Sequence, residues 1–467
     1  MHGHRPRRLR RRRRPEPPHR RRDPRRPGHP GPGPAVDHLL PGPRAEPGGI
    51  AAVVATTSQT VVVAGGSLAG HRVVAELARH GFAGDVVWVR GPEGTAPYSR
   101  PALSKELIQG KVTRDDIRLP GLDTHGLRLR VVDHAVCARL DPDDDRVLVT
   151  PTHEAPAEPS DGEWIPFDAL FVCTGTRARL PEAFAGLPNV HCLRTLADAE
   201  RIKERLPGRP RTVVVGAGLV GSEIAASLRS CGLPVELVVQ GRLPMDTVFG
   251  EDLGRFCLDR HHANGVTTRL LTTVTGLSAT EPDGPVVLTF DDGGQTCADL
   301  VVLGLGAVTA CEWLHGSGLD VSDGLGCDEA LRTARPNVFA AGDIANWRHP
   351  VFGRRMRVEH WSNASAQARH AVESWWAGLE GREPAPFAEV PYFWSDQYGL
   401  KYQMVGHARG HDEVSVERIG ADGYPFVTYF REGRVVAAAG VNAPRAVMRM
   451  KARIQSEATT IQGAYAG

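Results

Sequence analysis

The chain has 467 residues and a net charge of +2, with 41% hydrophobic and 24% charged residues. This length exceeds what one hydrophobic core usually serves, so two or three domains are expected, and the composition is ordinary for a globular protein. No apolar run approaches the roughly 20 residues that a membrane-spanning helix needs, so no membrane partner is predicted.

An arginine-rich extension precedes the predicted fold. Residues 1–28 contain 13 Arg and two acidic residues, a local charge of +11 that leaves −9 for the rest of the chain. Residues 1–57 are mostly Arg, Pro and Gly, a composition that cannot form a packed core, so we expect disorder there. The extension is either a tail attracted to nucleic acid or membrane, or untranslated sequence upstream of a start near Thr60. We favour the second interpretation and predict no specific nucleic-acid partner.

The eight cysteines form no Cys-x-x-Cys pair. Their spacing matches neither a zinc site nor an iron–sulfur cluster, so no metal site is predicted. Most are expected to be small buried residues in a reducing cytoplasm, which is the predicted location.

A strand, a glycine turn and a helix begin the predicted fold. Thr60–Ala64 is short, apolar and β-branched, as buried parallel strands are, and it leads into Gly65-Gly-Ser-Leu-Ala-Gly70. A helix is expected to follow, through about His80. Such a turn brings backbone N–H groups and a helix N-terminus to a pyrophosphate. Ser67 replaces the usual second glycine, and its small side chain still allows the backbone to approach a ligand.

An acidic residue follows the next expected strand, Val86–Arg90. Glu93 lies 28 residues after Gly65 and is a candidate for binding ribose hydroxyls. The register leaves Pro92 as an equally good match to that position.

A second strand–turn–helix contains the complete glycine pattern. Thr212–Val215 precedes Gly216-Ala-Gly218-Leu-Val-Gly221, with a helix expected at Ser222–Ser230 and a strand at Val235–Val239. Two such turns, 151 residues apart, predict two nucleotides bound by one α/β chain with two Rossmann-like domains.

A third motif is Ala340-Ala-Gly342-Asp343, after the strand-like segment Asn337–Phe339. The Asp343 carboxylate is suited to hydrogen-bonding a ribityl hydroxyl. Asp is also a favoured helix N-cap residue, which is the alternative interpretation.

These motifs and others resemble those of the FAD-dependent ferredoxin and rubredoxin reductases, relatives of apoptosis-inducing factor in the pyridine nucleotide-disulphide oxidoreductase superfamily. The resemblance covers about residues 58–455. The further segments that carry it are Pro97-Tyr-Ser-Arg-Pro-Ala-Leu-Ser-Lys105, Cys173-Thr-Gly-Thr-Arg177, Leu193-Arg-Thr-Leu196, Gly304-Leu-Gly-Ala307, Glu312-Trp-Leu314, Glu359-His-Trp361 and Pro391-Tyr-Phe-Trp-Ser-Asp-Gln397.

The resemblance implies a nested domain arrangement. Residues 58–176 and 304–376 would form an FAD-binding domain, and 177–303 an NAD(P)-binding domain inserted between its two parts. Residues 377–467 would form a C-terminal α+β domain.

Together, the glycine turns and the resemblance give the candidate cofactor residues. Those for FAD are Gly65, Ser67, Leu68, Ala69, Gly70, Glu93, Arg100, Lys105, Val136, Thr174, Gly175, Arg194, Gly342, Asp343, Glu359, His360 and Trp361. Those for NAD(P) are Gly216, Ala217, Gly218, Leu219, Val220, Gly221, Glu223, Gln240, Arg242, Gly304 and Gly306.

Two of these residues are candidate catalytic groups. The resemblance places Glu223 near the flavin, opposite Lys105. An ion pair there would hold a cation beside the N5 side of the flavin and favour the negatively charged reduced ring. The alternative for Lys105 is a solvated surface lysine, and the alternative for Glu223 is a partner for the helix dipole.

The cysteine positions distinguish this chain from other flavoenzymes with two dinucleotide folds. Disulfide reductases carry a Cys pair beside the flavin, whereas here no Cys precedes Cys137 and Arg100–Lys105 occupies that stretch. Electrons would therefore leave singly to a ferredoxin or similar small iron–sulfur protein, feeding an oxygenase or cytochrome P450.

Docking of an acidic carrier on a body with a charge of about −9 requires a local basic patch. The candidate clusters are Arg354, Arg355 and Arg357, and Arg445, Arg449, Lys451 and Arg453.

The residue after the second dinucleotide strand departs from the usual pattern. Gln240 replaces the Glu that binds ribose hydroxyls and repels a 2′-phosphate, and Arg242 nearby is able to bind such a phosphate. NADH is predicted from the resemblance, with NADPH as the alternative.

Other functions compatible with the sequence are a flavin-based redox switch of the apoptosis-inducing-factor type, the reductase component of a nitrite or dioxygenase system, and slow direct oxidation of NAD(P)H by oxygen. The oligomeric state is predicted to be a monomer or a homodimer.

Overall fold

The computed structural model of the chain describes residues 58–152, 162–279, 281 and 284–465, with side chains up to residue 457. The predicted extension, residues 1–57, lies outside this part. No helix in the described ranges is long and apolar enough to cross a membrane.

The first parallel sheet forms around the predicted strand Thr60–Ala64. Its order is β19-β7-β1-β2-β3, and each neighbouring pair is parallel. The strands are β1 (Thr60–Ala64), β2 (Asp85–Val89), β3 (Arg128–Val132), β7 (Ala169–Val172) and β19 (Val338–Ala340). Val61, Val62 and Val63 are fully buried, as expected for a parallel sheet covered on both faces. β2 begins one residue earlier than predicted because Asp85 pairs with Thr60.

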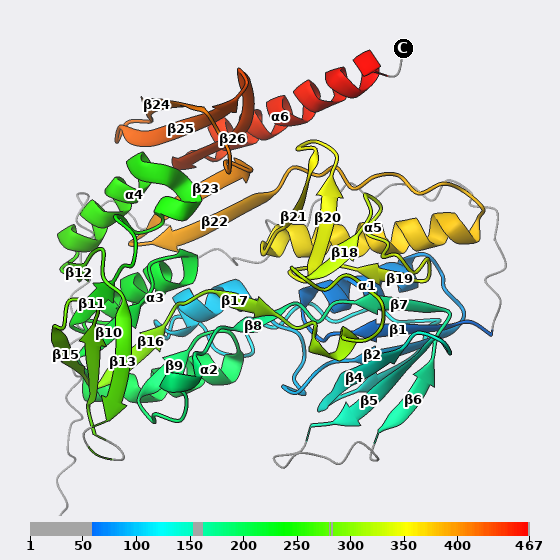
Figure 1. The fold of residues 1–467 in the computed structure, drawn as a ribbon, viewed down its shortest axis with the longest axis horizontal. Helices are drawn as coiled ribbons and strands as arrows, with labels where there is room; N and C mark the ends of the chain where they lie inside the picture. Colours follow the sequence, from blue (N-terminus) through cyan, green and yellow to red (C-terminus); the bar gives the residue numbers. More distant parts are fainter. Residues whose placement is uncertain (1–57, 153–161, 280, 282–283, 466–467) are drawn as a thin grey trace, which may run out of the picture. The chain divides into compact units, whose positions relative to one another are not determined.

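Helices and a small sheet accompany this first sheet (Figure 1). Helices α1 (Leu68–Arg79) and α5 (Trp361–Leu379) pack against each other, and α5 contacts β19. An antiparallel sheet follows β3 in the chain, with strands β4 (Ala135–Asp141), β5 (Arg146–Pro151) and β6 (Glu163–Pro166). Together these elements bury the largest apolar cluster of the described chain.

The second parallel sheet repeats the same plan around the second glycine turn. Its order is β12-β11-β10-β16-β9, with β9 (Val190–Cys192), β10 (Thr212–Val215), β11 (Val235–Val238), β12 (Thr267–Arg269) and β16 (Leu300–Leu303). Its helices are α2 (Leu196–Arg205), α3 (Leu219–Ser230) and α4 (Asp246–Ala263), and its antiparallel strands are β13 (Val274–Ala279), β14 (Val286–Phe290) and β15 (Gln295–Ala298). Helix α3 begins three residues before the predicted start at Ser222, because Gly218 is its N-cap residue.

Two short strands connect the parallel sheets. The chain leaves the first sheet after β7 through β8 (Thr176–Ala178) and returns after β16 through β17 (Ala307–Thr309). These strands pair antiparallel, Thr176 opposite Thr309. The second sheet is thus inserted between strands β7 and β19 of the first sheet, and the paired strands β8 and β17 connect the two.

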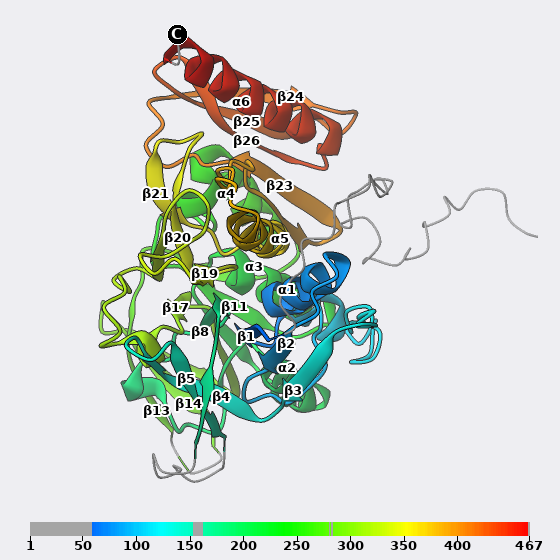
Figure 2. The same ribbon diagram turned by 90° about the vertical axis from the view of Figure 1, so that its right-hand side faces the viewer.

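A further small sheet and the C-terminal part complete the fold. The small sheet contains β18 (Leu325–Cys327), β20 (Ala345–His349) and β21 (Arg354–Arg357). The antiparallel C-terminal sheet has the order β22-β23-β26-β25-β24, with β22 (Tyr392–Gln397), β23 (Leu400–Gly406), β24 (Glu413–Ile419), β25 (Tyr424–Arg431) and β26 (Arg434–Val441). Helix α6 (Pro444–Tyr465) lies across this sheet against β26 and β23 (Figure 2). Helix α5 continues to Leu379, past the boundary placed at 376.

Short helical turns link these elements. They are Arg100–Ala102, Leu103–Leu107, Glu182–Phe184, Leu206–Gly208 and Glu312–Leu314. Leu103–Leu107 is a π-helical turn, a form often found at functional sites. It carries Ser104 and Lys105.

Candidate active site

Two cavities join into one cleft at the carboxyl ends of the first sheet's strands. They have volumes of about 300 and 580 Å³, which lie in the range of ligand sites. The residues they share are Ser67, Arg100, Cys173, Thr174, Thr176 and Arg194. The cleft therefore runs without a break past the ends of β1, β2, β7 and β19, where ligands bind in open α/β sheets.

Helices α1, α3 and α5 begin at this cleft without a side-chain cap. Their N-cap residues are Ser67, Gly218 and His360, and none makes a side-chain hydrogen bond to its helix. In α2, by contrast, the side chains of Thr195 and Asp198 form a capping box. Uncapped N-termini leave backbone N–H groups free and carry partial positive charge, so the cleft suits an anionic ligand such as a pyrophosphate.

The third glycine of each turn is required by close packing of helix and strand. A Cβ added at Gly70 would lie 1.9 Å from the carbonyl oxygen of Gly65, and one at Gly221 would lie 1.9 Å from that of Gly216. The second position is more tolerant, since a Cβ at Gly218 meets nothing within 4 Å. This explains why Ser67 fits at the corresponding position of the first turn.

Glu93 is the centre of a polar cluster on the wall of the larger cavity. It accepts hydrogen bonds from the Tyr98 hydroxyl and from Arg100 Nη2, the latter at 2.7 Å. The Tyr98 oxygen accepts from the Leu196 backbone N–H at 2.9 Å, and Arg100 Nη1 donates to the Arg194 carbonyl at 2.6 Å. The cluster therefore links the loop after β2 to the start of α2.

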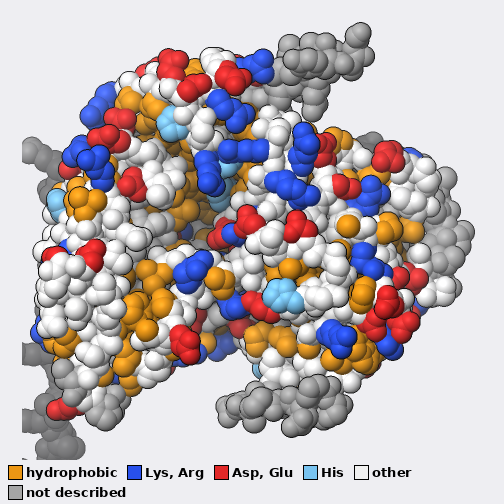
Figure 3. Space-filling view, viewed as in Figure 1, with side chains coloured by type: hydrophobic (Ala, Val, Ile, Leu, Met, Phe, Trp, Pro, Cys, Tyr) orange, Lys and Arg blue, Asp and Glu red, His pale blue; other side chains and the backbone are white. Residues whose placement is uncertain are grey.

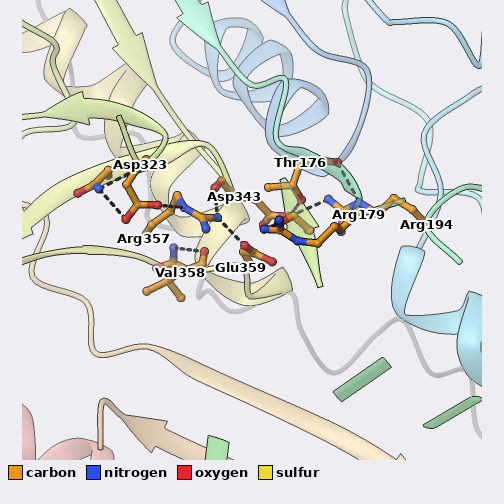
Figure 4. A network of polar contacts seen from close by, with 11 residues as sticks. Thr176, Arg179, Arg194, Asp323, Asp343, Arg357, Val358 and Glu359 are labelled. Atoms are coloured by element: carbon orange, nitrogen blue, oxygen red, sulfur yellow. Dashed lines mark hydrogen bonds and ion pairs between the residues drawn. The ribbon is translucent and has the colours of Figure 1, made fainter. Parts of the chain in front are cut away.

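Asp343 is the centre of a second polar network (Figure 4). It accepts hydrogen bonds from Arg194 Nη2 at 2.7 Å and from Thr176 Oγ1 at 3.2 Å. The chain enters β20 after Asp343, so the helix-cap interpretation was wrong because no helix begins there. Arg357 donates to the Asp343 carbonyl at 3.1 Å and also pairs with Glu359.

Lys105 and Glu223 form a buried ion pair where the π-helical turn Leu103–Leu107 packs against α3. Lys105 Nζ lies 3.1 Å from Glu223 Oε1, and their side chains are 8% and 7% exposed. The predicted pair is therefore present, and the surface interpretation of Lys105 was wrong because its side chain is buried against Glu223. Glu223 also accepts from Ser104 Oγ at 2.5 Å and from the Asp396 backbone N–H at 3.2 Å. Glu223 of helix α3 thus joins the turn that carries Lys105 to strand β22.

Aromatic side chains close the smaller cavity. His360 and Trp361 line it at the start of α5, and Phe393 and Trp394 line it from β22. The His360 ring lies 4.5 Å from that of Phe393. Burial lowers the pKa of His360 to about 4, so this ring is neutral at physiological pH.

Two cysteines line the larger cavity. Burial raises the pKa of Cys137 to about 12 and also raises that of Cys173. Because the thiolate is the reactive form, neither is prepared for thiol chemistry near neutral pH. Each cysteine of the chain is unpaired, and no cluster of three metal-ligating side chains occurs among the described residues.

Most of the sequence-predicted site residues line this cleft. They are Gly65, Ser67, Leu68, Ala69, Glu93, Arg100, Lys105, Val136, Thr174, Gly175, Arg194, Leu219, Val220, Glu223, Gly304, Gly306, Gly342, Asp343, Glu359, His360 and Trp361. Those that do not line it are Gly70, Gly216, Ala217, Gly218, Gly221, Gln240 and Arg242. Gly70 packs against the Gly65 carbonyl of its own turn, and the others belong to the second turn or to the loop after β11.

Comparison with protein families settles the ancestry of the chain. Residues 59–368 match the model of the pyridine nucleotide-disulphide oxidoreductases, and residues 392–466 match that of the reductase C-terminal domain. The chain belongs to the pyridine nucleotide-disulphide oxidoreductase family. This oxidoreductase chain also has the C-terminal domain of the reductases.

Individual relatives of this oxidoreductase are ferredoxin reductases. It is 34% identical to rhodocoxin reductase of Rhodococcus erythropolis over 85% of this chain and 90% of that protein. It is 31% identical to putidaredoxin reductase of Pseudomonas putida over 83% and 89%. The structure of the covalent putidaredoxin reductase–putidaredoxin complex matches with a TM-score of 0.77 and 30% identity, over 86% of this chain and 94% of that one. The predicted resemblance and fold class are confirmed.

Membership in the family implies FAD and a nicotinamide dinucleotide as cofactors. The cleft fits FAD by its own chemistry, because uncapped helix N-termini suit the pyrophosphate and an apolar, aromatic end suits a flat ring. Arg100 and Arg194 line both cavities and supply fixed positive charge where the two cavities meet.

Several residues of the cleft were not among those predicted. Ser104 and the Asp396 backbone orient Glu223, Tyr98 joins Glu93 to α2, and Trp394 lines the smaller cavity. The motifs Pro97–Lys105 and Pro391–Gln397 contain these residues. The motifs therefore indicated the segments, but only the folded chain shows which side chains meet.

Proposed function

We propose that this oxidoreductase transfers hydride from NADH to FAD and passes the electrons singly to a small acidic iron–sulfur protein. The observation that carries this proposal is the buried Lys105–Glu223 pair beside a cleft that suits FAD, with no thiolate-competent cysteine lining it. Bound flavin supplies the chemistry of accepting a hydride and releasing single electrons.

In this proposal the residues of the chain bind FAD, orient it and exclude water from it. In the proposal, the N-terminus of α1 would hold the pyrophosphate of FAD, Arg194 and Asp343 would bind its ribityl part, and the N-terminus of α5 would belong to the flavin end of the site. Lys105 provides a fixed positive charge where negative charge develops, in a site from which water is largely excluded. Glu223 holds the lysine in place, and Ser104 and the Asp396 backbone hold Glu223.

The absence of a thiol route determines where electrons go. The cysteines that line the cleft are held as thiols by burial, so electrons leave from the cofactor to an external carrier. The relatives named as ferredoxin reductase components of dioxygenase systems support this assignment. A cytochrome P450 or another oxygenase downstream of the carrier is part of the proposal.

An arginine cluster formed by Arg354, Arg409 and Arg431 is the proposed docking site for the acidic carrier. Burial and the charges of Arg431 and Arg409 lower the pKa of Arg354, so the three positive charges lie close together. None of them belongs to the ion pairs found among the described residues, whereas Arg357, Lys451 and Arg453 of the two predicted clusters are paired with acids. Figure 3 shows Lys and Arg side chains along the edge of a hollow in the face it presents.

NADH is proposed as the hydride donor, in agreement with relatives named as ferredoxin–NAD⁺ reductases. A cytoplasmic location stays a prediction from the cysteine usage.

Anaerobic stopped-flow mixing of the FAD-loaded protein with NADH tests the proposal. Rapid loss of the oxidised flavin absorbance is expected, followed by its return when putidaredoxin is added as the acceptor. An absorbance that does not change with NADH or NADPH, despite bound FAD, would refute the reductase function.

A further inference from the structure

The second dinucleotide strand ends without the acidic residue that ordinarily selects NADH. Strand β11 ends at Val238, and Gln240 is exposed two residues later. In Rossmann folds, an Asp or Glu near this position hydrogen-bonds the ribose hydroxyls, while an Arg accommodates a 2′-phosphate. The neutral amide of Gln240 has neither the negative charge that repels a 2′-phosphate nor the positive charge that attracts one.

The loop that follows Gln240 folds back onto the second glycine turn. The Met245 backbone N–H donates to the carbonyl of Ala217, in the middle of that turn, at 2.9 Å. Met245 has a left-handed backbone with φ of 63° and is 1% exposed, so its position is fixed by burial despite the cost of that conformation. The first turn of α4 is therefore held beside the turn expected to bind the dinucleotide.

This arrangement places a carboxylate at the end of β11. Asp246, the first residue of α4, lies directly over Gly241: a Cβ added there would be 2.8 Å from Asp246 Oδ2 and 3.2 Å from Oδ1. Gly241 is the immediate neighbour of Gln240, so only a residue without a side chain leaves room for the acid.

The Asp246 carboxylate is available for a ligand. Its Oδ1 accepts from the Thr247 backbone N–H at 2.7 Å. Neither an ion pair nor a hydrogen bond to Oδ2 occurs among the residues that the structure describes. Asp246 is half-buried, which keeps its charge effective at short range.

We propose that Asp246 replaces the missing acid at position 240 and determines the nucleotide specificity of this oxidoreductase. It accepts hydrogen bonds from the adenosine ribose hydroxyls of NADH and repels the 2′-phosphate of NADPH. Arg242 is exposed on the same loop and attracts a phosphate, and the carboxylate outweighs it. This inference rests on the proposed function, since it names the selective residue of that same nucleotide site.

Binding of two redox-inert probes tests the inference without flavin turnover. Calorimetry with ADP-ribose and with its 2′-phosphorylated form measures the preference on the FAD-loaded protein. The natural protein should prefer ADP-ribose, and Asp246→Asn should shift the ratio of dissociation constants at least about tenfold toward the phosphorylated probe, since a hydrogen bond to a charged group contributes at least this much.

Two further variants make the result specific. Gly241→Ala should shift the preference in the same direction, because its Cβ displaces the carboxylate while position 246 keeps its charge. Glu251→Gln removes an exposed acid on the same helix, 78% exposed, and should leave the preference unchanged.

An unchanged preference in Asp246→Asn, or a natural protein that prefers the phosphorylated probe, would overturn the inference. A failure of the proposed function is separate, because it appears as flavin that neither NADH nor NADPH reduces while the probes still bind.

Discussion

Replacing Lys105 with Met removes one charge of a buried pair and leaves the other in place. Lys105 Nζ and Glu223 Oε1 are 3.1 Å apart, and both side chains are less than a tenth exposed. Two unit charges at that separation attract by about 5 kcal/mol at an effective dielectric constant of 20. Removing one partner of a buried pair costs about 3–5 kcal/mol. Glu223 keeps its bonds from Ser104 and Asp396, so we expect the lower end, about 3 kcal/mol of unfolding free energy.

The midpoint potential of the flavin distinguishes a catalytic role of the Lys105–Glu223 pair from a purely structural one. If Lys105 favours the reduced flavin by about 1.4 kcal/mol, Lys105→Met lowers the two-electron midpoint potential by about 30 mV. Glu223→Gln removes the negative charge and should raise the potential, although it also destabilises the fold. A purely structural pair would reduce the stability of both variants without moving the two potentials in opposite directions.

Anaerobic redox titration followed by flavin absorbance gives the potentials, and denaturant unfolding gives the stabilities. Lys111→Met, which removes an exposed lysine a few residues along the chain, is the matched control and should change neither. Equal potentials in Lys105→Met, Glu223→Gln and the natural protein would refute the assigned role of the pair.

Other consequences follow from single positions. Gly221→Ala puts a Cβ 1.9 Å from the Gly216 carbonyl, so nucleotide reduction of the flavin should slow at least about tenfold while FAD content is kept; normal kinetics would contradict the packing argument. His349 is fully buried and its pKa is lowered by burial to about 4, below the unfolded value of about 6.5. Its contribution to stability is complete above pH 6.5 and declines as pH falls toward 4, because the unfolded chain binds a proton that the folded chain excludes. Unfolding free energy should fall by about 2–3 kcal/mol over this window, and by less in His349→Gln; equal declines in both proteins would remove His349 as the cause. Arg354→Glu should raise the KM for putidaredoxin and weaken its dependence on ionic strength, whereas Arg453→Glu should do neither if the arginine cluster is the docking site.

Local patterns in the sequence predicted the two parallel sheets well. The runs at Thr60–Ala64 and Thr212–Val215 are apolar, β-branched and followed by glycine turns, and both are strands with the expected bounds. Errors occurred at element ends. Helix α3 begins at Leu219 rather than Ser222 because the backbone of Gly218, not a side chain, starts the helix.

The arrangement of side chains was harder to predict because it depends on contacts between distant segments. The Lys105–Glu223 pair was expected only through the family resemblance, and Ser104 and Asp396 give no local sign that they orient Glu223. The second nucleotide site shows the same limit. Gln240 indicated a missing acid, but nothing in the local sequence shows that the Asp246 carboxylate lies over Gly241 or that Met245 hydrogen-bonds to Ala217.

The central claim is that the flavin takes two electrons from NADH and passes them one at a time to an iron–sulfur protein. Counting the electrons that arrive tests it most directly. The FAD-loaded protein is mixed anaerobically with a limiting amount of NADH and an excess of oxidised putidaredoxin, and the reduced iron–sulfur protein is measured by absorbance. The account predicts two molecules of reduced putidaredoxin for each NADH consumed, at a rate far above that without the enzyme. Consumption of NADH without reduction of putidaredoxin would contradict it.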